Sequence, residues 1–221
     1  MLQSHMLRLS LLILLYTLTL GALEIVSMPI VFDAQRIALS KEYIRTHYGF
    51  RPKDITIEPK IIVLHYTAVD DLKRSFLRFK APTLPIDRPD ISAAGRLNVS
   101  AHFLVDQNGT VYKLMPSNIM ARHVIGLNYS SIGIENVGGE NFKANLTAKQ
   151  IQSNIALIKK LIKTYPGISY LIGHSEYRCF ENTPLWLERD PHYRTPKEDP
   201  GAYFLDAVRA AFPQLKKAPC P

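Results

Sequence analysis

Two histidines and one aspartate stand where metal ligands are expected. His65 follows the apolar run at residues 61–64, and His174 ends a second, shorter run. Asp199 lies in the sequence KEDPG at residues 197–201, which closes a long polar stretch. Two imidazoles and one carboxylate leave a fourth position open, the pattern of catalytic zinc. Either histidine alone would more often be an ordinary buried one, but together these residues predict one zinc ion per chain.

Two further residues could complete a hydrolytic site at this metal. Zinc lowers the pKa of the water that it binds from about 15.7 toward about 7. Glu135 points away from Ile132 and Ile134 on its predicted strand, and an unpaired carboxylate in a buried strand is costly. Either a structural partner neutralises Glu135, or it faces the site as the general base for the water. Lys197 could stabilise an oxyanion, and its alternative is a solvated surface lysine.

Buried strands are needed to bring these side chains together. The β-branched and apolar residues 61–68, 131–137 and 169–173 predict three strands. Asn108-Gly109 between the apolar runs 99–105 and 110–114 predicts a hairpin. Ligand sites in open α/β sheets gather at the carboxyl ends of the strands, where His65 and His174 lie.

Helices are predicted on either side of these strands. Residues 147–165 have apolar positions at helical spacing and a capping box of Thr147 and Gln150. Shorter helices are expected in residues 28–50, with Ser40 as a cap, and at residues 70–79 and 203–212; residues 81–98 should form a surface loop. The expected fold class is α/β, a single domain with a central mixed β-sheet flanked by helices.

Composition and charge restrict the class of partner. The chain has 221 residues, of which 47% are hydrophobic, and a formal net charge of +8. This balance favours anionic partners such as nucleic acid, anionic lipid or an acidic cell-wall polymer. No dense Lys/Arg stripe interleaved with aromatics occurs, which weighs against nucleic acid. No H-E-x-x-H motif occurs either, so a zinc peptidase of that kind is not indicated.

The N-terminus predicts export. Residues 1–22 place Arg8 before an uncharged apolar run that ends in small residues, which is typical of a secretory signal peptide. Leu20 fits poorly three positions before a cut after Ala22, so an uncleaved membrane anchor is the alternative. We expect a protein of the periplasm or the exterior. There a disulfide between Cys179 and Cys220 is permitted, although both could remain free.

Six motifs in order resemble a known family. They are VLHYTA at 63–68, VSAHFLVDQNGTVYKLMP at 99–116, ARHVIG at 121–126, SIGIE at 131–135, GH at 173–174 and KEDPG at 197–201. Each is weak alone, but together they resemble the type-2 N-acetylmuramoyl-L-alanine amidases. This zinc family also includes the peptidoglycan recognition proteins and phage lysozyme-like amidases. The resemblance covers roughly residues 58–212.

The resemblance implies a reaction and a set of roles. It implies zinc at the positions matching His65, His174 and Asp199, and catalytic roles for Glu135 and Lys197. The reaction would be hydrolysis of the amide between the lactyl group of N-acetylmuramic acid and L-alanine, in peptidoglycan or muropeptides. Among the family's histidines near the groove, His102 would be mainly structural. The residues expected to contact substrate are His123, Tyr66, Arg194 and Trp186.

Several alternatives stay open. The loop after His174 looks longer than in compact relatives. Its aromatics would pack it onto the body unless Trp186, Tyr193 and Arg194 form a wall of the groove. Cys179 or Asp190 could replace Asp199 as the third ligand, but the Asp-Pro-Gly context after a lysine favours Asp199. A non-catalytic peptidoglycan-binding module is the alternative function. A monomer is expected, divided into a signal (1–22), a lead-in with a short helix (23–57), the catalytic domain (58–212) and a tail (213–221).

Overall fold

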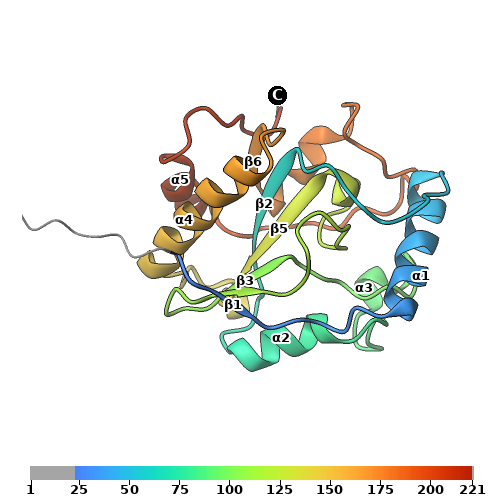
Figure 1. Cartoon of the computed structure of the whole chain (residues 1–221), viewed down its shortest axis with the longest axis horizontal. Helices are drawn as coiled ribbons and strands as arrows, with labels where there is room; N and C mark the ends of the chain where they lie inside the picture. Colours follow the sequence, from blue (N-terminus) through green and yellow to red (C-terminus); the bar gives the residue numbers. More distant parts are fainter. Residues whose placement is uncertain (1–22, 221) are drawn as a thin grey trace, which may run out of the picture.

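A six-stranded mixed sheet runs through the centre of the protein (Figure 1). The computed structural model describes residues 23–220. The strand order is β1-β4-β3-β5-β2-β6, and only β3 and β4 pair antiparallel. The strands are β1 (Ile25–Ser27), β2 (Ile61–Tyr66), β3 (Phe103–Val105), β4 (Val111–Lys113), β5 (Ser131–Asn136) and β6 (Tyr170–Gly173). The predicted α/β fold with a mixed sheet is confirmed.

Helices lie on both sides of this sheet (Figure 1). They are α1 (Ala34–Tyr43), α2 (Leu72–Lys80), α3 (Pro89–Ser92), α4 (Ala148–Thr164) and α5 (Ala202–Arg209). Helices α4 and α5 form one hydrophobic cluster with β2, β3 and β5. On the other face α2 packs near β3, while α1 belongs to a separate cluster beside the loops. The sheet is therefore covered on both faces, which is why β2 is apolar from Ile61 to Leu64.

The alternation of side chains along β2 and β5 selects the face that can carry a site. Ile62 and Leu64 of β2 belong to the cluster with α4 and α5, so His65 points to the opposite face. In the parallel register His65 pairs with Glu135 of β5. Neighbouring residues in register share a face of the sheet, so both polar side chains leave the sheet on the same side.

The first helix begins earlier than the sequence suggested. Asp33 caps α1 by accepting a hydrogen bond from the Arg36 N–H at 2.9 Å, whereas Ser40 lies inside the helix. The chain continues directly into a π-helix, η1 (Ile44–Tyr48), and leaves it at Gly49 with a φ of 78°. The expectation of a cap at Ser40 was wrong, because a carboxylate at the true N-terminus fills that role.

The long polar stretch after His174 is folded, not extended. Its start forms a 3₁₀-helix, η4 (His174–Phe180), which buries Tyr177 and Phe180. A disulfide between Cys179 and Cys220 ties the C-terminal tail to η4. The open question of the two cysteines is thereby answered, and the tail also pairs with the sheet at Lys216.

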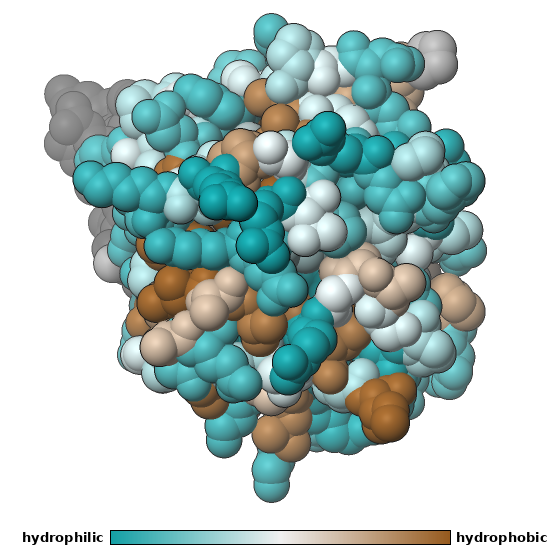
Figure 2. All heavy atoms as spheres, turned by 90° about the vertical axis from the view of Figure 1, so that its right-hand side faces the viewer, coloured by the Kyte–Doolittle hydropathy of each residue, from teal (hydrophilic) through white to brown (hydrophobic). Residues whose placement is uncertain are grey.

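Within residues 23–220 no helix combines the length and apolarity that crossing a bilayer requires. On the side of α1, hydrophilic side chains cover most of the surface and hydrophobic ones form separate small patches (Figure 2). The predicted signal segment, residues 1–22, lies outside the described residues.

Candidate metal centre

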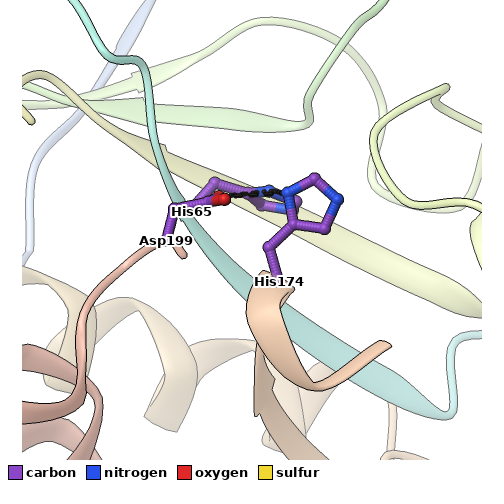
Figure 3. Close-up of side chains that lie close together, drawn as sticks. All are labelled: His65, His174 and Asp199. Atoms are coloured by element: carbon purple, nitrogen blue, oxygen red, sulfur yellow. Dashed lines mark hydrogen bonds and ion pairs between the residues drawn. The ribbon is translucent and has the colours of Figure 1, made fainter. Parts of the chain in front are cut away.

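Three ligand-type atoms meet at the carboxyl end of the central strands. His65 Nδ1 lies 3.0 Å from His174 Nδ1 and 3.2 Å from Asp199 Oδ2. The third side of this triangle, from His174 Nδ1 to Asp199 Oδ2, is 3.0 Å. All three residues are buried, and their side chains converge on one point from β2, η4 and the loop before α5 (Figure 3). The structure thus brings together the three predicted ligands.

Local contacts fix each of the three ligands. The Asn136 side-chain amide donates to the carbonyl oxygen of His65 at 3.0 Å, which ties β2 to β5. His174 opens η4, where Glu176 accepts the N–H of Gly173 and forms an ion pair with Arg209 of α5. The carbonyl oxygen of Asp199 accepts the Ser175 N–H at 3.0 Å, so the second histidine and the aspartate are held through adjacent backbone.

The electrostatics of the triangle favour the proton-free forms of His65 and Asp199. Burial and the neighbouring His174 lower the pKa of His65 to about 4. Burial alone would raise the pKa of Asp199, but His174 and His65 hold the pKa of its carboxyl well below the usual range. Neutral imidazoles and an ionised carboxylate are the forms that bind a metal.

Zinc fits this triangle. Bonds of about 2.0–2.1 Å in a tetrahedral site place neighbouring ligand atoms roughly 3.3 Å apart, close to the separations found here. Three acceptor atoms this close repel one another unless a cation or hydrogens lie between them. Among residues 23–220 this is the one group of three or more His, Cys, Asp or Glu whose ligand atoms all lie within 4.8 Å of one another.

Glu135 stands beside the triangle without a partner of its own. Its Oε2 is buried and accepts no hydrogen bond from residues 23–220. Burial and the charge of Asp199 raise the pKa of Glu135 well above its ordinary value, and Lys197 acts in the opposite direction. A buried carboxylate without a structural partner is costly, so its position indicates a function in the site.

A cavity of about 520 Å³ opens over these residues. Its wall includes all three ligands and Glu135, and Lys197 and Tyr66 contribute half-buried side chains. The exposed Phe142 and the cations Arg78 and Arg88 also line it. A concave site with a few convergent polar groups is the usual form of a ligand pocket.

The two other family-type histidines occupy different positions. His123 lines the cavity, but its ring nitrogens contact protein atoms: Nδ1 lies 3.0 Å from His65 Nε2, and Nε2 lies 3.2 Å from Ser131 Oγ. His102 is fully buried, with Nε2 donating to the carbonyl oxygen of Ile119 and Nδ1 accepting the N–H of Gly133. The contact between Ser131 and His123 was not predictable from the sequence, where the one signal is a polar residue at the start of a buried strand.

Trp186 and Arg194, two of the expected substrate contacts, do not line the cavity. The Arg194 guanidinium stacks over the Trp186 ring at 4.6 Å, and the indole lies against Gly126 and Tyr177. These contacts match the packing alternative, and a substrate role for either residue stays a prediction. The close approach explains Gly126, where an added Cβ would lie 2.6 Å from the indole.

The rival third ligands are placed elsewhere. Cys179 is bonded to Cys220 and has no free thiolate. Asp190 is exposed and accepts the N–H of His192 at 2.8 Å. Asp199 is therefore the carboxylate that the fold delivers to the two histidines.

The chain is similar in sequence to phage endolysins over part of its length. It is 36% identical over 86 residues to the endolysin of Escherichia phage T7, a match that covers 37% of this chain and 56% of the endolysin. The endolysin of Klebsiella phage KP32 is 33% identical over 84 residues, with 36% and 56% covered. The matched stretch thus spans about half the length of these curated relatives.

Solved structures share the fold. N-acetylmuramoyl-L-alanine amidase LysC from Clostridium intestinale has a TM-score of 0.55 at 22% identity, covering 87% of this chain and 99% of LysC. A selenomethionine derivative of AmpD has a TM-score of 0.51 at 23% identity, covering 85% and 94%. Residues 56–202 match the family model described as N-acetylmuramoyl-L-alanine amidase. The chain therefore belongs to the N-acetylmuramoyl-L-alanine amidase family, Amidase_2.

Proposed function

We propose that this protein is a zinc-dependent hydrolase of the amide bond between the lactyl group of N-acetylmuramic acid and L-alanine. The substrate would be peptidoglycan or soluble muropeptides. The observation that carries this proposal is the cluster of His65, His174 and Asp199 beside an unpartnered buried carboxylate, at the base of a cavity. Family membership supports the same reaction.

The three clustered residues would hold the metal, and Glu135 would act as the general base and then as the general acid. Zinc in this position supplies a Lewis acid that polarises the scissile carbonyl and makes water more acidic. Glu135 would accept a proton from the attacking water as its oxygen adds to the carbonyl carbon. It would then return a proton to the nitrogen of L-alanine as the C–N bond breaks, which leaves a carboxylic acid and a free amine.

The raised pKa of Glu135 is compatible with this role. Burial and Asp199 disfavour its ionised form, whereas the ammonium of Lys197 favours it. A divalent cation at the adjacent triangle would act in the same direction as Lys197, and more strongly. Metal binding would therefore favour the ionised form of Glu135, which can take a proton.

Lys197 would stabilise the negative charge that develops on the carbonyl oxygen. Its half-buried side chain lines the cavity, and its charge acts on both Glu135 and His65. A fixed cation in a site that excludes water stabilises such charge more strongly than solvent does. Tyr66, at the end of β2, would contact the substrate from the same wall of the cavity.

We further propose that the protein acts outside the cytoplasm, in the periplasm or after secretion. The disulfide between Cys179 and Cys220 supports this placement, because such bonds persist in oxidising compartments. The signal-like residues 1–22 point the same way.

Mass spectrometry of the products from a defined muropeptide tests the proposed reaction. The zinc-loaded protein should release the intact stem peptide with a free L-alanine amine and the sugar with a free lactyl carboxylate. Glu135→Gln should keep the zinc and release both products about 10²–10⁴-fold more slowly. Binding of the muropeptide without cleavage by the unaltered protein would instead favour a non-catalytic peptidoglycan-binding module. Cleavage of another bond would overturn the proposal.

A further inference from the structure

We propose that His123 and Ser131 form a hydrogen-bond chain that holds His65 in the tautomer that binds the metal. The chain runs from the Leu127 carbonyl oxygen through both side chains to His65 Nε2. Through it, His123 would act as a positioning residue. The inference rests on the metal assignment made above, but it concerns the protein before any metal binds.

The direction of every hydrogen bond follows from the last group of the chain. The Leu127 carbonyl oxygen can only accept, and Ser131 Oγ lies 2.8 Å from it. The serine therefore donates its single hydroxyl hydrogen to this carbonyl oxygen. At 3.2 Å from His123 Nε2, the hydroxyl oxygen then has only lone pairs to offer, so His123 Nε2 must carry the hydrogen that joins them.

The position of the hydrogen on His123 in turn determines which nitrogen of His65 is protonated. In its neutral form, the buried His123 ring carries a single ring hydrogen. A neutral imidazole with its hydrogen on Nε2 has a lone pair on Nδ1. His65 Nε2 lies 3.0 Å from His123 Nδ1 and must therefore donate its hydrogen to that atom. With its single ring hydrogen on Nε2, a neutral His65 keeps a lone pair on Nδ1, the atom at the triangle.

A competing tautomer shows why such a constraint is useful. Without the chain, His65 Nδ1 could carry the hydrogen and donate it to Asp199 Oδ2, which is 3.2 Å away. That arrangement would block two of the three metal-binding atoms with one proton. In the intact protein it is disfavoured, because it would leave two lone pairs facing each other between His65 Nε2 and His123 Nδ1.

The surroundings of His123 are shaped for this position. The Asn128 side-chain oxygen accepts the backbone N–H groups of His123 and Val124, each at 2.8 Å, and so fixes the loop. Gly133 of β5 leaves space for the ring, since an added Cβ would lie 2.7 Å from its atoms. The glycine of the SIGIE motif is thus required by a close approach, although its backbone conformation is ordinary.

Nitrogen NMR of the metal-free, ¹⁵N-histidine-labelled protein tests the tautomers directly. Long-range ¹H–¹⁵N couplings distinguish a ring with its hydrogen on Nε2 from one with it on Nδ1. We expect the Nε2–H form at both His65 and His123. A predominant Nδ1–H form at His65 would overturn the proposal, and this readout needs neither a variant nor activity.

Zinc affinity, measured by competition with a chelator, tests the consequence. Loss of an outer hydrogen-bond partner commonly weakens metal binding by about 10–100-fold. We expect a weakening of this size in His123→Leu and a smaller one in Ser131→Ala. His123→Asn should retain most of the affinity, because its amide oxygen can replace the Nδ1 acceptor.

Ser130→Ala provides a matched control. Ser130 is the neighbouring residue, and its hydroxyl donates to the same Leu127 carbonyl oxygen at 3.3 Å, but it does not contact His123. Its removal should leave zinc affinity unchanged. Affinity within about twofold of the unaltered protein in both Ser131→Ala and His123→Leu, with unchanged circular dichroism, would contradict the proposal. Should His123→Leu not fold, Ser131→Ala decides. If the unaltered protein binds no zinc, the metal assignment fails, while the NMR result still decides the tautomer.

Discussion

Two buried groups of histidine and carboxylate side chains lie within residues 23–220, and they differ in where their polar atoms point. At the first, His47 of η1 pairs with Glu188 at 3.0 Å through Nδ1, while its Nε2 donates to the Ala94 carbonyl oxygen at 3.1 Å. At the second, His65, His174 and Asp199 direct three ligand atoms at one point. Residue types and burial are alike; convergence is what differs.

This difference indicates a separate role for each group. The two nitrogens of His47 reach opposite ways and join three segments: the N-terminal π-helix, the loop of residues 81–98 and the loop that follows η4. Such a pair stabilises the wall beside the cavity. The convergent group directs three ligand atoms at one point, which is the arrangement that binds a metal cation. The N-terminal segment, much of which precedes the family-matched residues, is thus part of the same folded unit.

The largest expected contrast is between the two histidines. His65→Ala should abolish both zinc binding and hydrolysis, because two protein ligands hold zinc poorly. His47→Ala should keep one zinc per chain but lower the free energy of unfolding by about 1–3 kcal/mol, because it leaves buried polar groups unpaired. Elemental analysis after dialysis, together with urea unfolding, measures both. Equal zinc loss in the two variants would remove the distinction.

The two carboxylates should separate in the same way. Glu135→Gln should lower kcat by about 10²–10⁴-fold with zinc content unchanged, since general-base catalysis contributes this much. Glu188→Gln should instead cost about 1.5–3 kcal/mol of stability, because it removes a charged hydrogen-bond acceptor. Steady-state kinetics on a muropeptide and thermal melts provide the readouts. Near-normal turnover in Glu135→Gln would exclude it from the mechanism.

The disulfide should matter for stability more than for the metal. Paired replacement, Cys179→Ala with Cys220→Ala, should lower the free energy of unfolding by about 2–4 kcal/mol, because the unfolded chain gains freedom. Zinc stoichiometry should stay at one per chain, since neither sulfur is a ligand. Zinc loss on reduction would return Cys179 to consideration as the third ligand.

His102 gives the smallest effect and a defined pH dependence. Burial lowers its pKa to about 4 in the folded protein, against about 6.5 in the unfolded chain. Its contribution is therefore complete above pH 6.5 and is lost as the pH falls toward 4, because only the unfolded chain takes up the proton. By pH 5 the loss reaches about 2 kcal/mol.

Urea unfolding of the metal-free protein, compared at pH 7.5 and pH 5, measures this loss. Between these pH values His102→Gln should lose less stability than the unaltered protein, because it lacks the proton uptake at His102. The other buried histidines are present in both proteins, so the comparison isolates His102. Parallel falls would show that His102 does not titrate in this range.

Much of the fold was predictable because single segments determine it. A local sequence signal marks four of the elements. Apolar runs predict β2, β5 and β6, and a capping box with helical spacing predicts α4. Features created by distant partners were not predictable. Strand β1 has three residues and exists through its pairing with β4. The cap at Asp33 was also missed, although it is local.

The same reasoning applies to the site. Motifs and strand ends identified the residues that converge, because parallel strands deliver their carboxyl ends to one edge. They did not reveal the contact between His123 and Ser131, nor that Trp186 packs on Gly126, because those contacts depend on side chains meeting across loops. Sequence patterns therefore identify functional residues more readily than the residues that orient them.

A crystal structure of the zinc-loaded protein, with anomalous data on both sides of the zinc absorption edge, tests the central claim most directly. It should show a single anomalous peak within about 2.0–2.2 Å of His65 Nδ1, His174 Nδ1 and Asp199 Oδ2. A peak at any other group of residues, or an occupied site that lacks one of these three atoms, would contradict the assignment of this cluster as the metal centre.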